Sequence, residues 1–108
     1  MTDGTPVRDT LVQMNEGTLE RSGLNPGTFM LARIAALAAA GAPPVSHLVN
    51  LEVASESGVS PEQVQGVLIA IAPVVGGAAT AAAAVSITRA LGMAIELGEL
   101  AEEDAGAS

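Results

Sequence analysis

The 108-residue chain contains no cysteine, tryptophan or tyrosine, and Phe29 is its one aromatic residue. Without cysteine it can form no disulfide, no thiolate metal site and no thiol redox centre. Lysine is absent too, and twelve acidic residues outweigh the arginines to give a net charge of −8. This balance argues against nucleic acid and against an anionic membrane surface as partners.

The N-terminal sequence MTDGTPVRDT carries an acid before any apolar run, which is not the pattern of a secretory signal, so we expect a cytoplasmic protein. The length predicts a single domain over residues 1–98, followed by an acidic, disordered tail over residues 99–108. Hydrophobic residues make up 49% of the chain, but many are alanines. Small side chains bury little area each, so the chain gains stability by sharing surfaces with copies of itself, and we expect a homo-oligomer.

Residues 64–88 carry no charge and are long enough to raise the question of a membrane span. Pro73 lacks the backbone N–H that an uninterrupted helix needs, and Gly76 and Gly77 follow closely. The run is therefore predicted to form two helices in the core of an Ala-rich subunit. A membrane hairpin, packed through its small residues, is the remote alternative.

Helix-start signals divide the chain into helical segments. A capping residue precedes proline at Thr5-Pro6 and Asn25-Pro26, and the sequence SPEQ at residues 60–63 is a capping box. Together with the glycines, these signals predict helices over about 6–22, 26–40, 43–57, 61 to the break near Pro73, and 78–97. The predicted fold is all-α.

The segment from LARIAALAAAGAPPVSHLVN through SGVSPEQVQGVLIAIAPVVGGAATAAAA resembles the carboxymuconolactone decarboxylase family, which includes the alkylhydroperoxidase D-like proteins. The resemblance covers residues 29–97 and rests on the order and spacing of the helices. It implies a compact orthogonal bundle of five to six helices that assembles as a homotrimer or homohexamer, with sites at or near subunit interfaces.

The reactive residues of the peroxidase-like members are missing. Counting back from Gly58, the family's Cys-x-x-Cys positions fall on Pro43 and Ser46, and its histidine position falls on Asn50. The family's glutamate, expected near residues 30–31, is absent as well. Thiol peroxidase activity is excluded, because without a thiolate there is no nucleophile to attack a peroxide.

In the decarboxylase branch of the family, the resemblance implies an acid–base role at the position that Asn50 occupies. Asn50 does not titrate, but His47 lies one turn earlier and Arg33 can hold a carboxylate by a bidentate pair. We therefore take His47, Asn50 and Arg33 as the candidate catalytic residues. The alternative interpretation, which we favour for His47 and Arg33, places His47 at a surface or interface and pairs Arg33 with Glu52 or Glu56.

No metal site and no cofactor is predicted. Glu52 and Glu56 have a spacing that carboxylate metal sites use, but a solvated or arginine-paired face explains them better. Arg89 is predicted to meet an acid across a subunit interface, or else to bind an anion. The sequence supports two functions equally: a lyase or hydrolase that acts on a small carboxylate or lactone, and a noncatalytic structural or binding homo-oligomer of the same fold.

Overall fold

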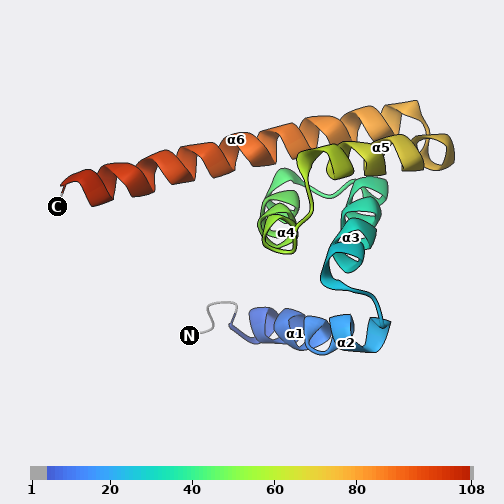
Figure 1. Cartoon of the computed structure of the whole chain (residues 1–108), viewed down its shortest axis with the longest axis horizontal. Helices are drawn as coiled ribbons and strands as arrows, with labels where there is room; N and C mark the ends of the chain where they lie inside the picture. The colour runs from blue at the N-terminus through green and yellow to red at the C-terminus, as the bar shows by residue number, and fades with distance from the viewer. Residues whose placement is uncertain (1–4, 108) are drawn as a thin grey trace.

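The computed structural model describes the backbone of residues 5–107 and the side chains of residues 6–7, 9–10, 13–93 and 95. Over these residues the chain forms six helices and no strand, which confirms the predicted all-α fold. The helices are α1 (Thr5–Asn15), α2 (Thr18–Ser22), α3 (Pro26–Ala40), α4 (Pro44–Glu56), α5 (Pro61–Val75) and α6 (Gly77–Ala107). Helices α3 and α4 run across the direction of α5 and α6 (Figure 1).

Small and medium apolar side chains at helical spacing form the core. Helix α3 contributes the buried residues Met30, Ile34 and Ala38, spaced four residues apart. Met30 and Ile34 pack with Ala54 and Val59, which come from the end of α4 and the turn after it. On α6 the buried residues are Ala83, Ile87 and Ala90. Because most of these side chains are small, each helix buries a narrow stripe and leaves much apolar surface exposed.

The capping signals place the helix starts correctly. The Asn25 side chain accepts a hydrogen bond from the Thr28 backbone N–H at 2.8 Å, at the start of α3. At the start of α5, the Gln63 backbone N–H donates to Ser60 Oγ at 3.2 Å, and the Ser60 N–H donates to Gln63 Oε1 at 2.9 Å. These contacts satisfy backbone donors that the first turn of a helix leaves without partners.

The charge-free run divides as the sequence predicts. Pro73 lies inside the last turn of α5, and the chain then reverses at Gly76, whose φ of 94° and ψ of 157° are open to glycine alone. Helices α5 and α6 consequently pack side by side (Figure 1). Among the described residues, no helix is both long enough and apolar enough to span a bilayer.

Two predicted helix boundaries are wrong. The single helix expected over residues 6–22 is broken at Gly17, whose φ of 71° is left-handed, so that α1 and α2 are separate. At the other end, α6 continues to Ala107, whereas we expected the helix to end at residue 97. The division of the chain at residue 98 and the acidic, disordered tail after it stay predictions.

Helices α1 and α2 form an arm beside the bundle of α3 to α6. Of the described helices, α1 contacts only α2, and α2 contacts only α1 and α3. The arm lies at the start of α3, which is the end of that helix far from α5 and α6 (Figure 1). Val7 and Met14, predicted to share the apolar side of the first helix, are 65% and 66% exposed, so the bundle does not cover them. The side chain of Leu11 lies outside the described residues.

Candidate functional site

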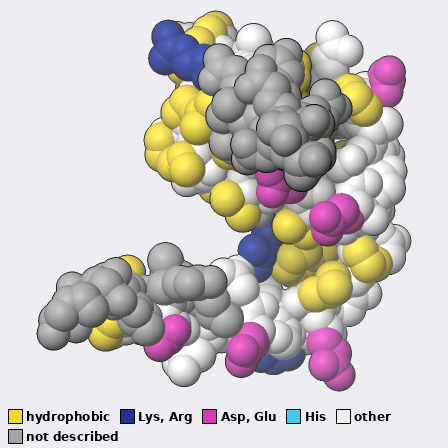
Figure 2. All heavy atoms as spheres, turned by 90° about the vertical axis from the view of Figure 1, so that its left-hand side faces the viewer, with side chains coloured by type: hydrophobic (Ala, Val, Ile, Leu, Met, Phe, Trp, Pro, Cys, Tyr) yellow, Lys and Arg dark blue, Asp and Glu magenta, His cyan; other side chains and the backbone are white. Residues whose placement is uncertain are grey.

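A cavity of about 330 Å³ lies between the arm and the bundle. Its walls come from the end of α1, from α2, from the first half of α3 and from α4. The described residues that line it are Asn15, Leu19, Phe29, Met30, Arg33, Val49, Asn50 and Val53. Figure 2 shows an open notch between the arm and the bundle, with a basic side chain and hydrophobic side chains along its wall. The notch leaves the cavity accessible to solvent.

Arg33 supplies the positive charge of this cavity. Its guanidinium carbon lies 4.5 Å from the centroid of the Phe29 ring, one helical turn earlier on α3. Stacking of this kind holds a guanidinium group by cation–π attraction and leaves its N–H groups available at its edge. The alternative ion pair with Glu52 or Glu56 is absent from the described part of the chain, where both carboxylates are exposed.

Asn50 faces the same cavity from α4. Its side-chain amide donates to the backbone carbonyl of Ser46 at 2.9 Å, which fixes the orientation of the amide. One N–H and the carbonyl oxygen of the amide are left for a ligand. The cavity therefore brings together two of the three predicted site residues, Arg33 and Asn50.

His47 does not join them. Its side chain has 0% exposure and lies on the buried face of α4 with Ala54, and it is not among the residues that line the cavity. Burial lowers the pKa of His47, because the interior disfavours the imidazolium. Neither Nδ1 nor Nε2 has a hydrogen-bond partner among the described residues. The expectation of a surface position is therefore wrong.

The burial of His47 has a signal in the sequence. Leu51 and Ala54 follow it at spacings of four and seven, which places all three on one face of a helix. The contribution of the arm has no such signal: Asn15 and Leu19 reach the cavity only because the chain turns at Gly17.

The described side chains that line the cavity suit anion binding better than proton transfer. Their polar groups are one guanidinium and two amides, and the described lining holds no carboxylate, histidine or cysteine side chain that could transfer a proton. The rest of the lining is apolar and partly exposed, so it can contact the apolar body of a ligand while Arg33 attracts an anion. The cavity can hold a small molecule that has one carboxylate and an apolar body.

The other predicted candidates lie apart from the cavity. Arg89 is exposed on α6, and Glu52 and Glu56 are exposed on α4. Within the described residues, no group of three or more carboxylate or histidine side chains is placed to hold a metal ion.

Comparison with known proteins gives one match. The model of the carboxymuconolactone decarboxylase family matches residues 6–90, and thus begins at the arm, earlier than the residue 29 expected from the sequence. No curated protein and no solved structure matches the chain. Because the family model covers most of the chain, including five helix starts from the arm to α6, the chain belongs to the carboxymuconolactone decarboxylase family.

Proposed function

We propose that this chain binds a small organic carboxylate in the cavity between the arm and the bundle, with Arg33 as the anchor, and that it does not turn the ligand over. One observation carries the proposal: Arg33 and Asn50 line the same cavity, without a described side chain that titrates near neutral pH. The α-helices α3 and α4 present the two polar groups from facing walls. The apolar side chains between them suit the body of a small carboxylate or lactone acid.

The energetics favour Arg33 as the anchor. A hydrogen bond to a charged group contributes about 1.5–3 kcal/mol, roughly a 10- to 150-fold change in the dissociation constant. Stacking on Phe29 restricts the guanidinium before a ligand arrives, so less side-chain entropy is lost on binding. Asn50 can donate its second amide N–H to the same carboxylate.

Lyase or hydrolase activity in the same cavity is the weaker candidate function. Decarboxylation or lactone hydrolysis needs a group that transfers a proton, and Asn50 stands where the family resemblance places a histidine. His47 is buried outside the cavity, and Glu52 and Glu56 are exposed away from it. Binding without turnover fits these positions better. A cytoplasmic location and assembly into a homotrimer or homohexamer belong to the same proposal.

Isothermal titration calorimetry tests the anchor. The wild-type chain is titrated with a five-membered lactone that carries an acetate side chain, and then with the primary amide of that acid. We expect the acid to bind at least tenfold more tightly than the amide, because only the carboxylate pairs with Arg33.

The substitution Arg33→Gln should remove this preference, whereas Arg89→Gln provides a matched loss of charge outside the cavity and should leave binding unchanged. NMR spectra of the lactone after prolonged incubation should show no product. Equal binding by the wild-type and Arg33→Gln chains would refute the assigned site, and steady conversion of the lactone would refute binding without turnover.

A further inference from the structure

Three valines form a row along one side of α4. Val45, Val49 and Val53 follow one another at a spacing of four, so they lie on one face of the helix. They are 56%, 57% and 44% exposed, and we name this row the valine stripe. Val49 and Val53 line the cavity that contains Arg33, whereas Val45 is not among its lining residues. The stripe therefore leads from the cavity onto the open surface of α4.

The two ends of the valine stripe differ in charge. From residue 34 to residue 51, which covers the second half of α3, the turn at Gly41 and the first part of α4, the sequence contains no Asp, Glu, Lys or Arg. Glu52 and Glu56 follow later on α4, beside Val53, and both are exposed. An apolar chain laid over these carboxylates would remove water from them at a cost in free energy. The end of the stripe at Val45 imposes no such cost from its own part of the chain.

Arg33 and Asn50 lie near the middle of the valine stripe. Asn50 directly follows Val49 on α4, and both residues line the cavity together with Arg33. A carboxylate held by Arg33 and Asn50 would therefore have an apolar side chain beside it. The guanidinium group is the only charged group among the described lining residues, so it fixes where the head group of an anionic ligand binds.

The cavity is small for a ligand with a long chain. Its volume of about 330 Å³ is near the lower end of the range of about 300–1,000 Å³ that is usual for ligand pockets. On one side Asn15 and Leu19 of the arm form its wall. A carboxylate with more than a few carbon atoms would fill the cavity and extend out through the notch beside the arm (Figure 2). The valine stripe offers that chain an apolar surface on its way out.

We propose that the ligand of this cavity is a straight-chain aliphatic monocarboxylate, with its head group on Arg33 and Asn50 and its chain running past Val49 to Val45. The inference rests on the proposed function and adds the class of ligand to it. Val45 lies about 6 Å from Val49 along the helix axis, four residues at about 1.5 Å each. An extended chain advances about 1.3 Å for each C–C bond of about 1.5 Å. Octanoate is therefore long enough to reach Val45, and butanoate is not.

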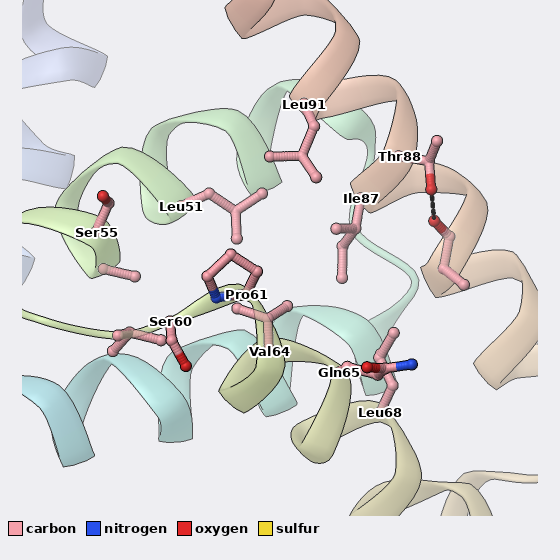
Figure 3. A pocket seen from close by; sticks show the side chains of 13 residues that line it. Leu51, Ser55, Ser60, Pro61, Val64, Gln65, Leu68, Ile87, Thr88 and Leu91 are labelled. Carbon is pink, nitrogen blue, oxygen red and sulfur yellow. Dashed lines mark hydrogen bonds between the residues drawn. The ribbon is translucent and has the colours of Figure 1, made fainter.

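The hollow between α4, α5 and α6 lacks an anchor for such a ligand. Its volume is similar, about 320 Å³, and Leu51, Val64, Ile87 and Leu91 point into it (Figure 3). Its described lining contains no charged side chain, so a carboxylate there would lose water without gaining an ion pair. This hollow shares no described lining residue with the Arg33 cavity and provides an internal control for binding that depends on the chain alone.

NMR titrations with butanoate, octanoate and octanedioate measure the contribution of the chain. A fully buried methylene group tightens binding about fourfold and a half-covered one about twofold, so octanoate should bind at least about 16-fold more tightly than butanoate. Octanedioate should bind about tenfold more weakly than octanoate, because its second carboxylate would lie on the uncharged end of the valine stripe.

Two threonine substitutions test the position of the chain. Val45→Thr keeps the shape of the side chain but places a hydroxyl group under the end of octanoate, so it should lower the ratio of octanoate to butanoate affinity about threefold. The matched control is Val85→Thr on α6, a valine that is 49% exposed and does not line the cavity, and it should leave the ratio unchanged. Arg33→Gln should weaken the binding of both acids.

Nuclear Overhauser contacts from the terminal methyl group of bound octanoate locate the end of the chain. We expect contacts to the methyl groups of Val45. Contacts only to Leu19 in the arm or to Ile87 in the other hollow, equal affinities for butanoate and octanoate, or an affinity ratio that Val45→Thr leaves unchanged would overturn the inference. In each of these cases a loss of butanoate binding in Arg33→Gln would leave the proposed function standing. If Arg33→Gln weakens neither acid, the proposed function fails and this inference fails with it.

Discussion

His47 is fully buried with both ring nitrogens lacking described partners. A buried polar group without a partner costs about 1–3 kcal/mol. The interior also disfavours its charged form, so its pKa lies below the ordinary value. Both effects reduce the stability of the folded chain, and the second makes stability depend on pH.

The sign of this dependence follows from which state binds the proton. Below the ordinary histidine pKa of about 6.5, the unfolded chain takes up a proton that folded His47 does not. The free energy of unfolding should therefore fall as the pH drops from 7.5 through 5.5, by at most about 1.4 kcal/mol per pH unit. Urea unfolding at pH 7.5, 6.5 and 5.5 measures this change in the free energy of unfolding.

His47→Leu should remove this pH dependence and leave the chain at least as stable at pH 7.5, because leucine needs no hydrogen-bond partner. If the free energy of unfolding of the variant still falls as the pH drops, the pH dependence comes from groups other than His47. A loss of more than about 2 kcal/mol at pH 7.5 would show that the imidazole makes a hydrogen bond, through water or a partner copy.

Arg33 and Asn50 show how far single residues could be placed from the sequence. Asn50 was selected because it occupies the family's histidine position, and Arg33 because it can pair with a carboxylate; both line one cavity. The prediction for His47 was wrong because it relied on the polarity of the side chain. The helical spacing of His47 with Leu51 and Ala54 already places it on the buried face of α4. The stacking of Arg33 on Phe29 has a local signal, because residues four apart on a helix are neighbours, but the sequence analysis considered only an ion pair with Glu52 or Glu56.

Helix starts were predictable where an N-capping side chain is followed directly by proline. Asn25-Pro26 and the capping box at Ser60 each satisfy backbone donors and fix the backbone direction, and α3 and α5 begin there. Helix ends were less predictable. Gly17 breaks the first helix, whereas Gly92 and Gly98 lie within α6 without ending it. A glycine permits a left-handed turn but does not require one, so its surroundings decide.

The connection between α5 and α6 gives a test of backbone strain. Gly76 has a φ of 94°, and adjacent Gly77 begins α6 without a positive φ. Gly76→Ala should destabilise the chain by about 1–3 kcal/mol, because the conformation is strained for any residue with a Cβ atom. Gly77→Ala should stabilise it slightly, by about 0.4–1 kcal/mol, because the unfolded chain loses freedom.

Urea unfolding of the two variants gives the comparison. An added Cβ atom meets no heavy atom within 4 Å at either position, so crowding does not contribute to the difference. Equal stabilities for Gly76→Ala and Gly77→Ala would show that the turn adopts another conformation in solution.

Among the described residues, the two larger hollows of the molecule have different chemistry and lie on either side of α4. The cavity beside the arm contains a guanidinium and two amides. The hollow between α4, α5 and α6, which we call the α6 groove, is uncharged over its described lining. We assign a small carboxylate to the first. Self-association, which the alanine content predicts, stays a prediction, as does the subunit contact expected at Arg89.

The arm is the part of the molecule whose role was least predictable. Among the described helices, the arm contacts the bundle only where α2 meets α3. Asn15 and Leu19 of the arm nevertheless form one side of the cavity. Periodicity describes a helix but not where a five-residue helix after a turn will dock. The family match, which begins at residue 6, is consistent with the arm being an integral part of the domain.

An NMR titration that follows the Arg33 side-chain Nε–H and the Asn50 side-chain amide tests the assigned site most directly. The acetate-bearing lactone should shift both resonances in a saturable way, and its primary amide should shift them little at the same concentrations. Resonances of Ile87 and Thr88 in the α6 groove should stay unchanged. Saturable shifts confined to the groove, or equal shifts with the acid and the amide, would contradict a carboxylate site at Arg33.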